Sequence, residues 1–300
     1  MITIFIVQAL FGLVSPLNKH ALLYCSPIFF VAGKLLCAGL VLLGYHFWRH
    51  SSWHAIPLRH WPLYAQIILI GNFSAHFLKY WGLQYVSATK MAFIFNMSPF
   101  FVALFSYVRF GTKLSRIQLS GLTISFLGLI PILMTSSIQE FNMGEFLIIS
   151  WPELAIFIAT IMHALSMTSK RVLMHENNYW PVQVNALCFL GSGIVACLFI
   201  ALNYPLYNPS SSDLPTITSY ILITTFISKV VCSTLYMHLM KYYSTTLLAF
   251  MDYWYLLFVA FWSWLFFGEQ VTLHFWLSAF IIFFGQYLFY REELQITKFH

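Results

Sequence analysis

Long apolar segments recur along the whole sequence, and each has about the length that crosses a bilayer as a helix. A membrane-spanning α-helix needs about 20 consecutive, mostly apolar residues. The segments with this property cover approximately residues 2–22, 28–47, 61–82, 87–108, 117–135, 150–170, 182–203, 216–239, 245–267 and 272–290. Because only short connections remain between them, the sequence predicts an all-α polytopic membrane protein with ten transmembrane helices.

The composition excludes the soluble classes of protein. Only 8% of the residues are charged and 60% are hydrophobic, whereas a soluble domain has about 25% charged residues. The formal net charge of +6 would suit a nucleic-acid partner, but the basic residues are scattered and no soluble domain carries them. We therefore exclude nucleic acid and expect membrane lipids and a small-molecule substrate as partners. A homo-oligomer is left open.

No catalytic or metal-binding motif occurs in the sequence. The five cysteines have no metal-ligand spacing and lie mostly in apolar runs, as buried small hydrophobic residues do. There is no His-Glu-x-x-His, no Gly-x-Ser-x-Gly and no phosphate-binding glycine loop. The sequence predicts that the protein is not an enzyme and uses neither cofactor nor metal, so any energy coupling comes from an ion or substrate gradient.

The positions of lysine and arginine predict the orientation of the chain. With ten spans, both termini lie on one side, and that side carries ten basic residues: Arg49, Arg59, Arg109, Lys113, Arg116, Lys170, Arg171, Lys241, Arg291 and Lys298. The opposite loops carry Lys90 and Lys19 together with the acids Glu140, Glu145 and Asp213. Because cytoplasmic loops are enriched in basic residues, we expect a multi-pass protein of the cytoplasmic (inner) membrane with both termini in the cytoplasm.

A weak internal repeat relates the two halves of the chain. A shift of 157 residues aligns residues 92–115 with 249–272 without a gap, and eight of these 24 positions are identical. The same shift aligns Gly128 with Gly285. Five spans in each half would make the second half enter the membrane in the opposite direction, as in the inverted repeats of secondary transporters. We expect two inverted five-helix repeats, residues 1–140 and 141–300, with a substrate site between them.

Several motifs carry a resemblance to a known family. They are Ser87-Ala88-Thr89-Lys90-Met91-Ala92-Phe93, Ser98-Pro99-Phe100, Phe110-Gly111-Thr112-Lys113-Leu114-Ser115, Leu247-Leu248-Ala249 and Phe267-Gly268-Glu269-Gln270-Val271-Thr272. With Lys34 early in the second span, the chain resembles the EamA family of the drug/metabolite transporter superfamily over nearly its whole length. It departs from the family pattern at Thr112, where glutamate is usual, and at Leu256, where proline is usual.

The resemblance implies a secondary transporter that moves small polar metabolites by alternating access. It implies first an amino acid or related carboxylate-bearing compound, most often exported. The alternative is an importer of a nucleoside-like metabolite such as S-adenosylmethionine. A membrane-embedded enzyme or lipid-handling protein would need a reactive group of residues that no motif supplies, and a channel fits the mirrored repeats less well than a carrier.

Polar stripes at matched positions of the two halves are the first candidates for the substrate site. They consist of Asn72, His76 and Lys79 in the third predicted span and Lys229, Ser233 and Tyr236 in the eighth. Residues with this spacing share one helical face. Lys229 lies too deep to reach the membrane surface easily, so we expect it to face a cavity. Lys79 lies near a span end, where it either snorkels or lines the cavity.

Three further ionisable residues complete the candidate site. Lys34 either snorkels or faces the cavity, and the family resemblance favours the cavity. Asp252 is the one acid well inside a predicted span, where it pairs with a lysine, binds a substrate amine or carries a proton. His163 is either a hydrogen-bonded core residue or a proton carrier. Asp252, His76 and His163 are the coupling candidates, and the excess of lysine predicts a negative group on the substrate.

Residues at the predicted span ends have expected structural roles. Glu269 is expected to cap a helix or anchor a loop, and Lys19 and Lys170 are expected to be interfacial anchors. The aromatic run Tyr253–Tyr255 beside Asp252 is a candidate for stacking on a planar part of the substrate.

Overall fold

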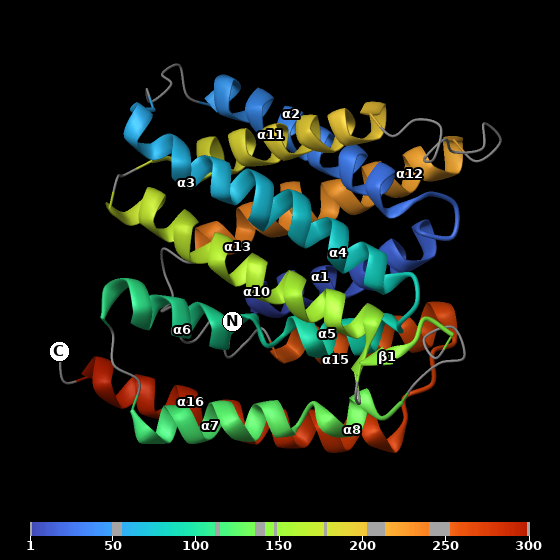
Figure 1. Cartoon of the computed structure of the whole chain (residues 1–300), viewed down its shortest axis with the longest axis vertical. Helices are drawn as coiled ribbons and strands as arrows, with labels where there is room; N and C mark the ends of the chain where they lie inside the picture. The colour runs from blue at the N-terminus through green and yellow to red at the C-terminus, as the bar shows by residue number, and fades with distance from the viewer. Residues whose placement is uncertain are drawn as a thin grey trace.

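The computed structural model describes residues 2–49, 56–111, 115–135, 142–146, 149–176, 179–202, 214–239 and 253–298. These residues are mostly helical, and their helices lie side by side across the molecule (Figure 1). In that view the end of α2, the start of α7 and the C-terminus lie on the left, while the α1–α2 connection and the β1 strand lie on the right.

The first half of the chain begins with two uninterrupted helices, α1 (Ile2–Ala21) and α2 (Pro27–Arg49). After the 3-10 turn η1 (Leu58–His60), one continuous helical stretch runs through α3 (Trp61–Gln66), the π-helical η2 (Ile67–Ser74) and α4 (Ala75–Leu83). The wider π-helical turn changes the direction in which the following side chains point, and such turns are frequent at functional sites.

The fourth and fifth predicted spans are each broken in the structure. The fourth consists of α5 (Ala88–Phe95) and α6 (Ser98–Phe110), and the fifth of α7 (Arg116–Leu127) and α8 (Ile130–Leu133). Pro99 and Pro131 lie in the first turn of α6 and α8. A proline in that position lacks the N–H that would continue the preceding helix, which accounts for both breaks.

The second half begins with a two-residue antiparallel pair, β1 (Glu145–Phe146) and β2 (Ile149–Ser150). Its helical elements follow in chain order: α10 (Trp151–Arg171), the π-helical η3 (Val172–Glu176), α11 (Pro181–Leu202), α12 (Leu214–Thr225), the π-helical η5 (Phe226–Cys232), α13 (Ser233–Leu239), α15 (Tyr253–Phe267) and α16 (Leu273–Lys298). The predicted start of the ninth span, residue 245, falls in 240–252, outside the described residues.

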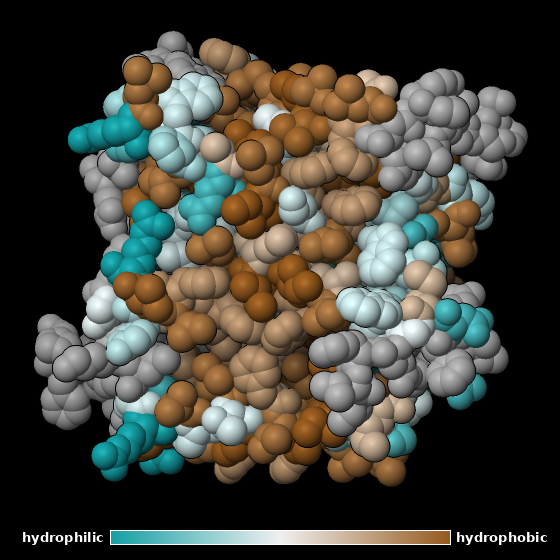
Figure 2. Space-filling model, viewed as in Figure 1, coloured by the Kyte–Doolittle hydropathy of each residue, from teal (hydrophilic) through white to brown (hydrophobic). Residues whose placement is uncertain are grey.

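The apolar helices give the protein the character of a membrane protein. When α5–α6, α7–α8 and α12–η5 are each counted as one span, seven helical stretches among the described residues are long and apolar enough to cross a bilayer, and two shorter apolar helices, Trp254–Phe267 and Leu273–Phe289, follow them. Figure 2 shows a broad hydrophobic surface between a left edge and a right edge where hydrophilic residues gather. This distribution is what the hydrocarbon layer of a bilayer requires of the surface that faces it.

Helices from the two halves pack directly against each other. α2 lies along α11, α7 lies along α16, α1 packs against α15, and α10 packs against α5 and α6. α7 and α16 approach each other closely at Gly121 and Gly285, where a Cβ added to Gly121 would lie 2.4 Å from the carbonyl oxygen of Gly285. Small residues allow such close approach between membrane helices, so a larger side chain at either position would push α7 and α16 apart.

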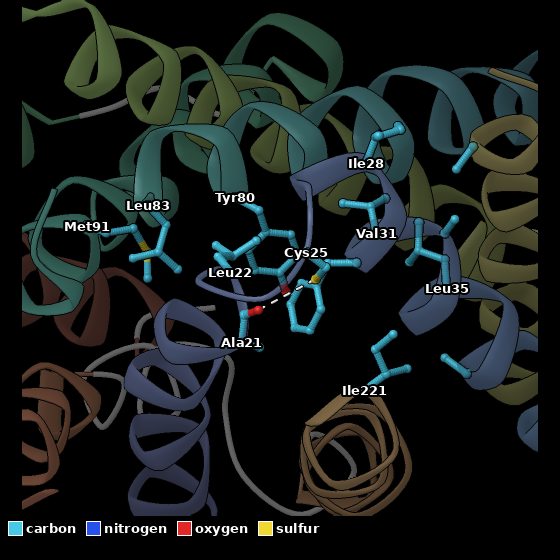
Figure 3. Packing of buried hydrophobic residues seen from close by; sticks show 14 of the residues in the cluster. Ala21, Leu22, Cys25, Ile28, Val31, Leu35, Tyr80, Leu83, Met91 and Ile221 are labelled. Carbon is cyan, nitrogen blue, oxygen red and sulfur yellow. Dashed lines mark hydrogen bonds between the residues drawn. The ribbon is translucent and has the colours of Figure 1, made fainter. Parts of the chain in front are cut away.

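A buried apolar cluster fills the region around the α1–α2 connection (Figure 3). Leu22 and Cys25 of the connection pack with Leu83 of α4, Met91 of α5 and Ile221 of α12. The Cys25 thiol donates to the Ala21 carbonyl oxygen, and burial raises the pKa of this thiol to about 12. Cys25 therefore stays a protonated packing residue, as its apolar surroundings in the sequence indicate.

Candidate substrate site

The two predicted polar stripes meet in the structure. Lys229 lies in η5 and His76 lies in the first turn of α4, and the Lys229 Nζ is 3.3 Å from the His76 Nε2. Because a lysine ammonium can only donate, Nε2 accepts and the ring proton is assigned to Nδ1. His76 Nδ1 and the Asn72 Nδ2 are both buried and have no hydrogen-bond partner among the described residues.

Lys79 and His163 meet at a phenyl ring. The Lys79 Nζ lies 3.7 Å from the centre of the Phe95 ring, and the centre of the His163 ring lies 4.9 Å from the same point. A cation over an aromatic face is attracted by about 0.5–2 kcal/mol. Lys79 therefore turns toward α5 and α10 inside the protein instead of snorkelling.

Lys34 of α2 is buried, with 2% of its surface exposed. Its Nζ donates to the Asn18 Oδ1 of α1 at 2.8 Å. The same ammonium group lies 5.1 Å from the centre of the Phe30 ring and 5.5 Å from that of Tyr80. Lys34 thus faces the interior, and its positive charge is solvated by one amide oxygen and two aromatic faces.

Lys170 also points inward, contrary to the expectation that it is an interfacial anchor. Its Nζ lies 5.2 Å from the centre of the Phe189 ring of α11, and the Lys229 Nζ lies 4.6 Å from the same ring centre. In a helix the Cα–Cβ bonds tilt toward the N-terminus. A lysine one residue before the end of α10 therefore reaches back into the protein.

These residues form one basic cluster, which we define as Lys34, His76, Lys79, His163, Lys170 and Lys229. The members lie close enough to interact electrostatically. Lys170 and Lys79 repel the ammonium group of Lys229. Lys229 and Lys79 repel that of Lys34. Of the ion pairs between described residues, Lys19–Glu269 and Lys90–Glu153, neither includes a member of the basic cluster. The cluster thus presents hydrogen-bond donors without a carboxylate from the described part of the chain.

Burial differs among members of the basic cluster. Lys34 is almost fully covered, whereas His76, Lys79, His163, Lys170 and Lys229 keep partial solvent access. None of the six residues is fully exposed, so each lies at least partly within the protein.

The remaining predicted site residues are placed differently. Ser233 is partly buried at the start of α13, and Tyr236 packs against the apolar cluster of Ile4, Val7, Cys232 and Leu239. In the aromatic run, the Tyr255 hydroxyl is 2.7 Å from the Ser15 Oγ, and Trp254 packs edge-on against Phe5. Asp252 and the Tyr253 side chain lie outside the described residues.

Glu269 joins three segments, as expected for a loop anchor. Its Oε1 is 3.1 Å from the Lys19 Nζ at the end of α1 and accepts from the Ala88 backbone N–H at 3.2 Å. Its Oε2 accepts from the Thr89 hydroxyl at 3.2 Å. A carboxylate beside the first residues of α5 is favoured by the helix dipole. These contacts to α1 and to the first turn of α5 agree with the prediction that Glu269 caps a helix or anchors a loop.

A buried ion pair was not predicted from the sequence. Lys90, assigned there to a loop, lies in α5 with 2% of its surface exposed and pairs with Glu153 of α10, which is 1% exposed. Lys90 also donates to the Thr135 carbonyl oxygen at 2.7 Å. Glu153 forms a capping box with Ser150 at the start of α10. The Ser-x-x-Glu pattern at 150–153 was the one local signal for part of this arrangement.

Comparisons with known proteins agree with the helical architecture. The model of the EamA-like transporter family matches residues 1–134 and 150–291. An S-adenosylmethionine/S-adenosylhomocysteine transporter of Chlamydia muridarum (strain MoPn / Nigg) is 25% identical over 281 residues, with 93% of this chain and 87% of that protein covered. A transporter of the same name from Chlamydia trachomatis serovar L2 is 25% identical over 288 residues, covering 93% of this chain and 85% of that protein.

A solved crystal structure shares the fold at low sequence identity. The match has a TM-score of 0.64 at 14% identity and covers 99% of this chain and 97% of the other. The structural match and the two stretches matched by the family model both extend over nearly the whole chain. The chain belongs to the EamA-like transporter family.

Proposed function

We propose that the protein is a secondary transporter that carries a small carboxylate-bearing metabolite by alternating access. The observation that supports this function is the basic cluster with its unpartnered donors, His76 Nδ1 and Asn72 Nδ2. A buried donor left without a partner costs about 1–3 kcal/mol. An anionic group beside Lys229 would accept from its ammonium group and reduce the repulsion among the lysines.

The alternating-access part of the proposal rests on two inverted five-helix repeats, residues 1–140 and 141–300. Under the 157-residue shift, α1 overlaps α10 and α6 falls within α15, so the packing of α1 on α15 corresponds to that of α10 on α6. The π-helical segments η2 and η5 occupy nearly matched positions. Gly111 and Gly268, 157 residues apart, both have left-handed backbone angles, with φ of 69° and 65°. Ten spans and a rocking motion of one repeat against the other follow from this symmetry.

The orientation follows from where the basic residues lie. The ends of α2, α6 and α10 carry Arg49, Arg109 and Arg171, and α7 begins with Arg116. We place these ends and both termini in the cytoplasm and the protein in the inner membrane. A green fluorescent protein fused to the C-terminus is therefore expected to fluoresce in bacterial cells. An active alkaline phosphatase fused at the same position would contradict this orientation.

Counterflow in proteoliposomes tests the transport function. Vesicles preloaded with an unlabelled amino acid are expected to accumulate the labelled compound transiently above its equilibrium level, because a carrier exchanges cargo across the membrane. The carboxyl methyl ester of the same compound should give no overshoot, since it cannot offer an anion to the basic cluster. A steady ohmic current in planar bilayers would instead indicate a channel, and absence of counterflow for every carboxylate tested would refute the proposal.

A second candidate cargo is a nucleoside-like metabolite such as S-adenosylmethionine. Two Chlamydia relatives carry that substrate in their names, and the partly buried phenyl ring of Phe95 in the site offers a stacking surface for a purine. The same counterflow assay separates the candidates. Exchange with S-adenosylhomocysteine but not with free amino acids would favour the nucleoside-like cargo.

A further inference from the structure

Lys170 and Lys229 approach one aromatic ring from different helices. Lys170 belongs to α10 and Lys229 to η5, and their Nζ atoms lie 5.2 Å and 4.6 Å from the centre of the Phe189 ring of α11. The two ammonium groups therefore lie less than about 10 Å apart, from the sum of these two distances. Two like charges held this close in a partly enclosed site repel each other.

The described part of the chain does not neutralise this pair. Neither ammonium group contacts a carboxylate of a described residue. The charged or titratable groups that act on the pair are the basic residues His163, His76 and Lys79 and the thiol of Cys188, which is not a carboxylate. An attraction of each cation to a phenyl face is worth about 0.5–2 kcal/mol. That gain does not remove the need for a counter-charge.

We propose that Lys170 and Lys229 form an anion subsite around Phe189 that gives the transporter a preference for cargo groups carrying two negative charges. A phosphate or a dicarboxylate carries enough charge to balance both ammonium groups, whereas a monocarboxylate balances one of them. This inference rests on the proposed transport function, because it treats the Lys170–Lys229 pair as part of the cargo site. It adds Lys170 as a specificity-determining residue and a doubly charged anion as the cargo chemistry.

Anion binding to the purified protein tests the subsite without requiring transport. Thermal unfolding in detergent is followed at constant ionic strength while inorganic phosphate, succinate or acetate is titrated. The wild-type protein is expected to bind phosphate and succinate saturably and about tenfold more tightly than acetate. Failure of wild-type protein to distinguish the dianions from acetate would overturn the proposal.

Variants of two neighbouring basic residues locate the effect. Lys170→Gln should weaken phosphate binding about tenfold and change acetate binding less than about twofold, while Lys170→Arg, which keeps the charge, should retain most of the preference for dianions. Arg171→Gln, at an exposed neighbouring position, is the matched control and should bind like the wild type. Unchanged phosphate binding in both Lys170→Gln and Lys229→Gln would refute the subsite. If Lys170→Gln does not fold, Lys229→Gln carries the same test.

The same titration distinguishes a soluble cargo from a lipid headgroup, which could also supply a phosphate. It is repeated in micelles containing phosphatidylglycerol and in micelles containing only uncharged lipid. Dianion binding is expected in both. If dianion binding is lost in the phosphatidylglycerol micelles but kept in the uncharged ones, the subsite binds lipid and the cargo proposal is overturned. Dianion selectivity without counterflow of any cargo would leave the subsite standing and refute the transport function instead.

Discussion

Lys229→Ala is expected to reduce uptake into proteoliposomes by on the order of a hundredfold, while the protein is still produced and purified as a monodisperse species. The Lys229 ammonium group lies 3.3 Å from His76 and 4.6 Å from the centre of the Phe189 ring. Removing one partner of an enclosed charge interaction costs about 2–5 kcal/mol of binding. A hundredfold loss corresponds to about 2.7 kcal/mol.

A matched variant shows whether the loss is local to the cluster. Arg291→Ala removes a basic residue at an exposed position of α16, and uptake should stay within about twofold of the wild type because exposed charges contribute little. Lys229→Arg keeps the charge but changes the donor geometry, so partial uptake is expected. Wild-type rates for Lys229→Ala would remove this residue from the site.

Glu153→Gln is expected to lower the thermal midpoint of the detergent-purified protein by roughly 6–10 °C. The substitution leaves Lys90 charged and buried without its carboxylate partner. Breaking a buried ion pair in this way typically costs about 3–5 kcal/mol, and for a protein of this size each kcal/mol shifts the midpoint by about 2 °C. Glutamine can still complete the capping box at Ser150. The shift in the midpoint therefore measures the loss of the negative charge at position 153. The midpoint is measured as the temperature at which half the protein still elutes as a single species.

The double variant Lys90→Met/Glu153→Gln separates the charge from the packing. It removes both charges and keeps apolar bulk near the position of the lysine, and a buried pair replaced in this way often loses little stability. We expect the double variant to recover at least half of the decrease in thermal midpoint that Glu153→Gln causes. If Glu153→Gln alone unfolds within about 1 °C of the wild type, the pair does not stabilise the fold.

The helix bounds were predicted well where a continuous apolar run sets them. The first predicted span, 2–22, corresponds to α1, Ile2–Ala21, and the sixth, 150–170, to α10, Trp151–Arg171. Bilayer thickness fixes the length of such a run. The breaks before α6 and α8 were missed because the prolines there keep the surrounding sequence apolar. The π-helical segments η2 and η5 have no composition signal of their own.

The candidate site was predicted in part. The spacing of Asn72, His76 and Lys79 predicts a shared helical face, and the structure adds that Lys229 approaches His76. Lys170 and Lys90 were assigned to the membrane surface or a loop because their distance along the chain from a span end was small. Their side chains nevertheless reach inward to Phe189 and Glu153. Such directions depend on the packing of helices far apart in the sequence, which spacing within one helix does not encode.

An experimental density map of the protein with its cargo bound tests the central claim most directly. The claim is that two oppositely oriented repeats enclose a basic site that binds the anionic group of the cargo. The map is expected to place that group among α4, α10, α11 and η5, within about 3 Å of the Lys229 Nζ. It should also show residues 1–140 superposing on 141–300 after rotation about an axis in the membrane plane. Cargo bound elsewhere, with Lys79 and Lys229 facing lipid, would contradict the claim, as would halves that fail to superpose.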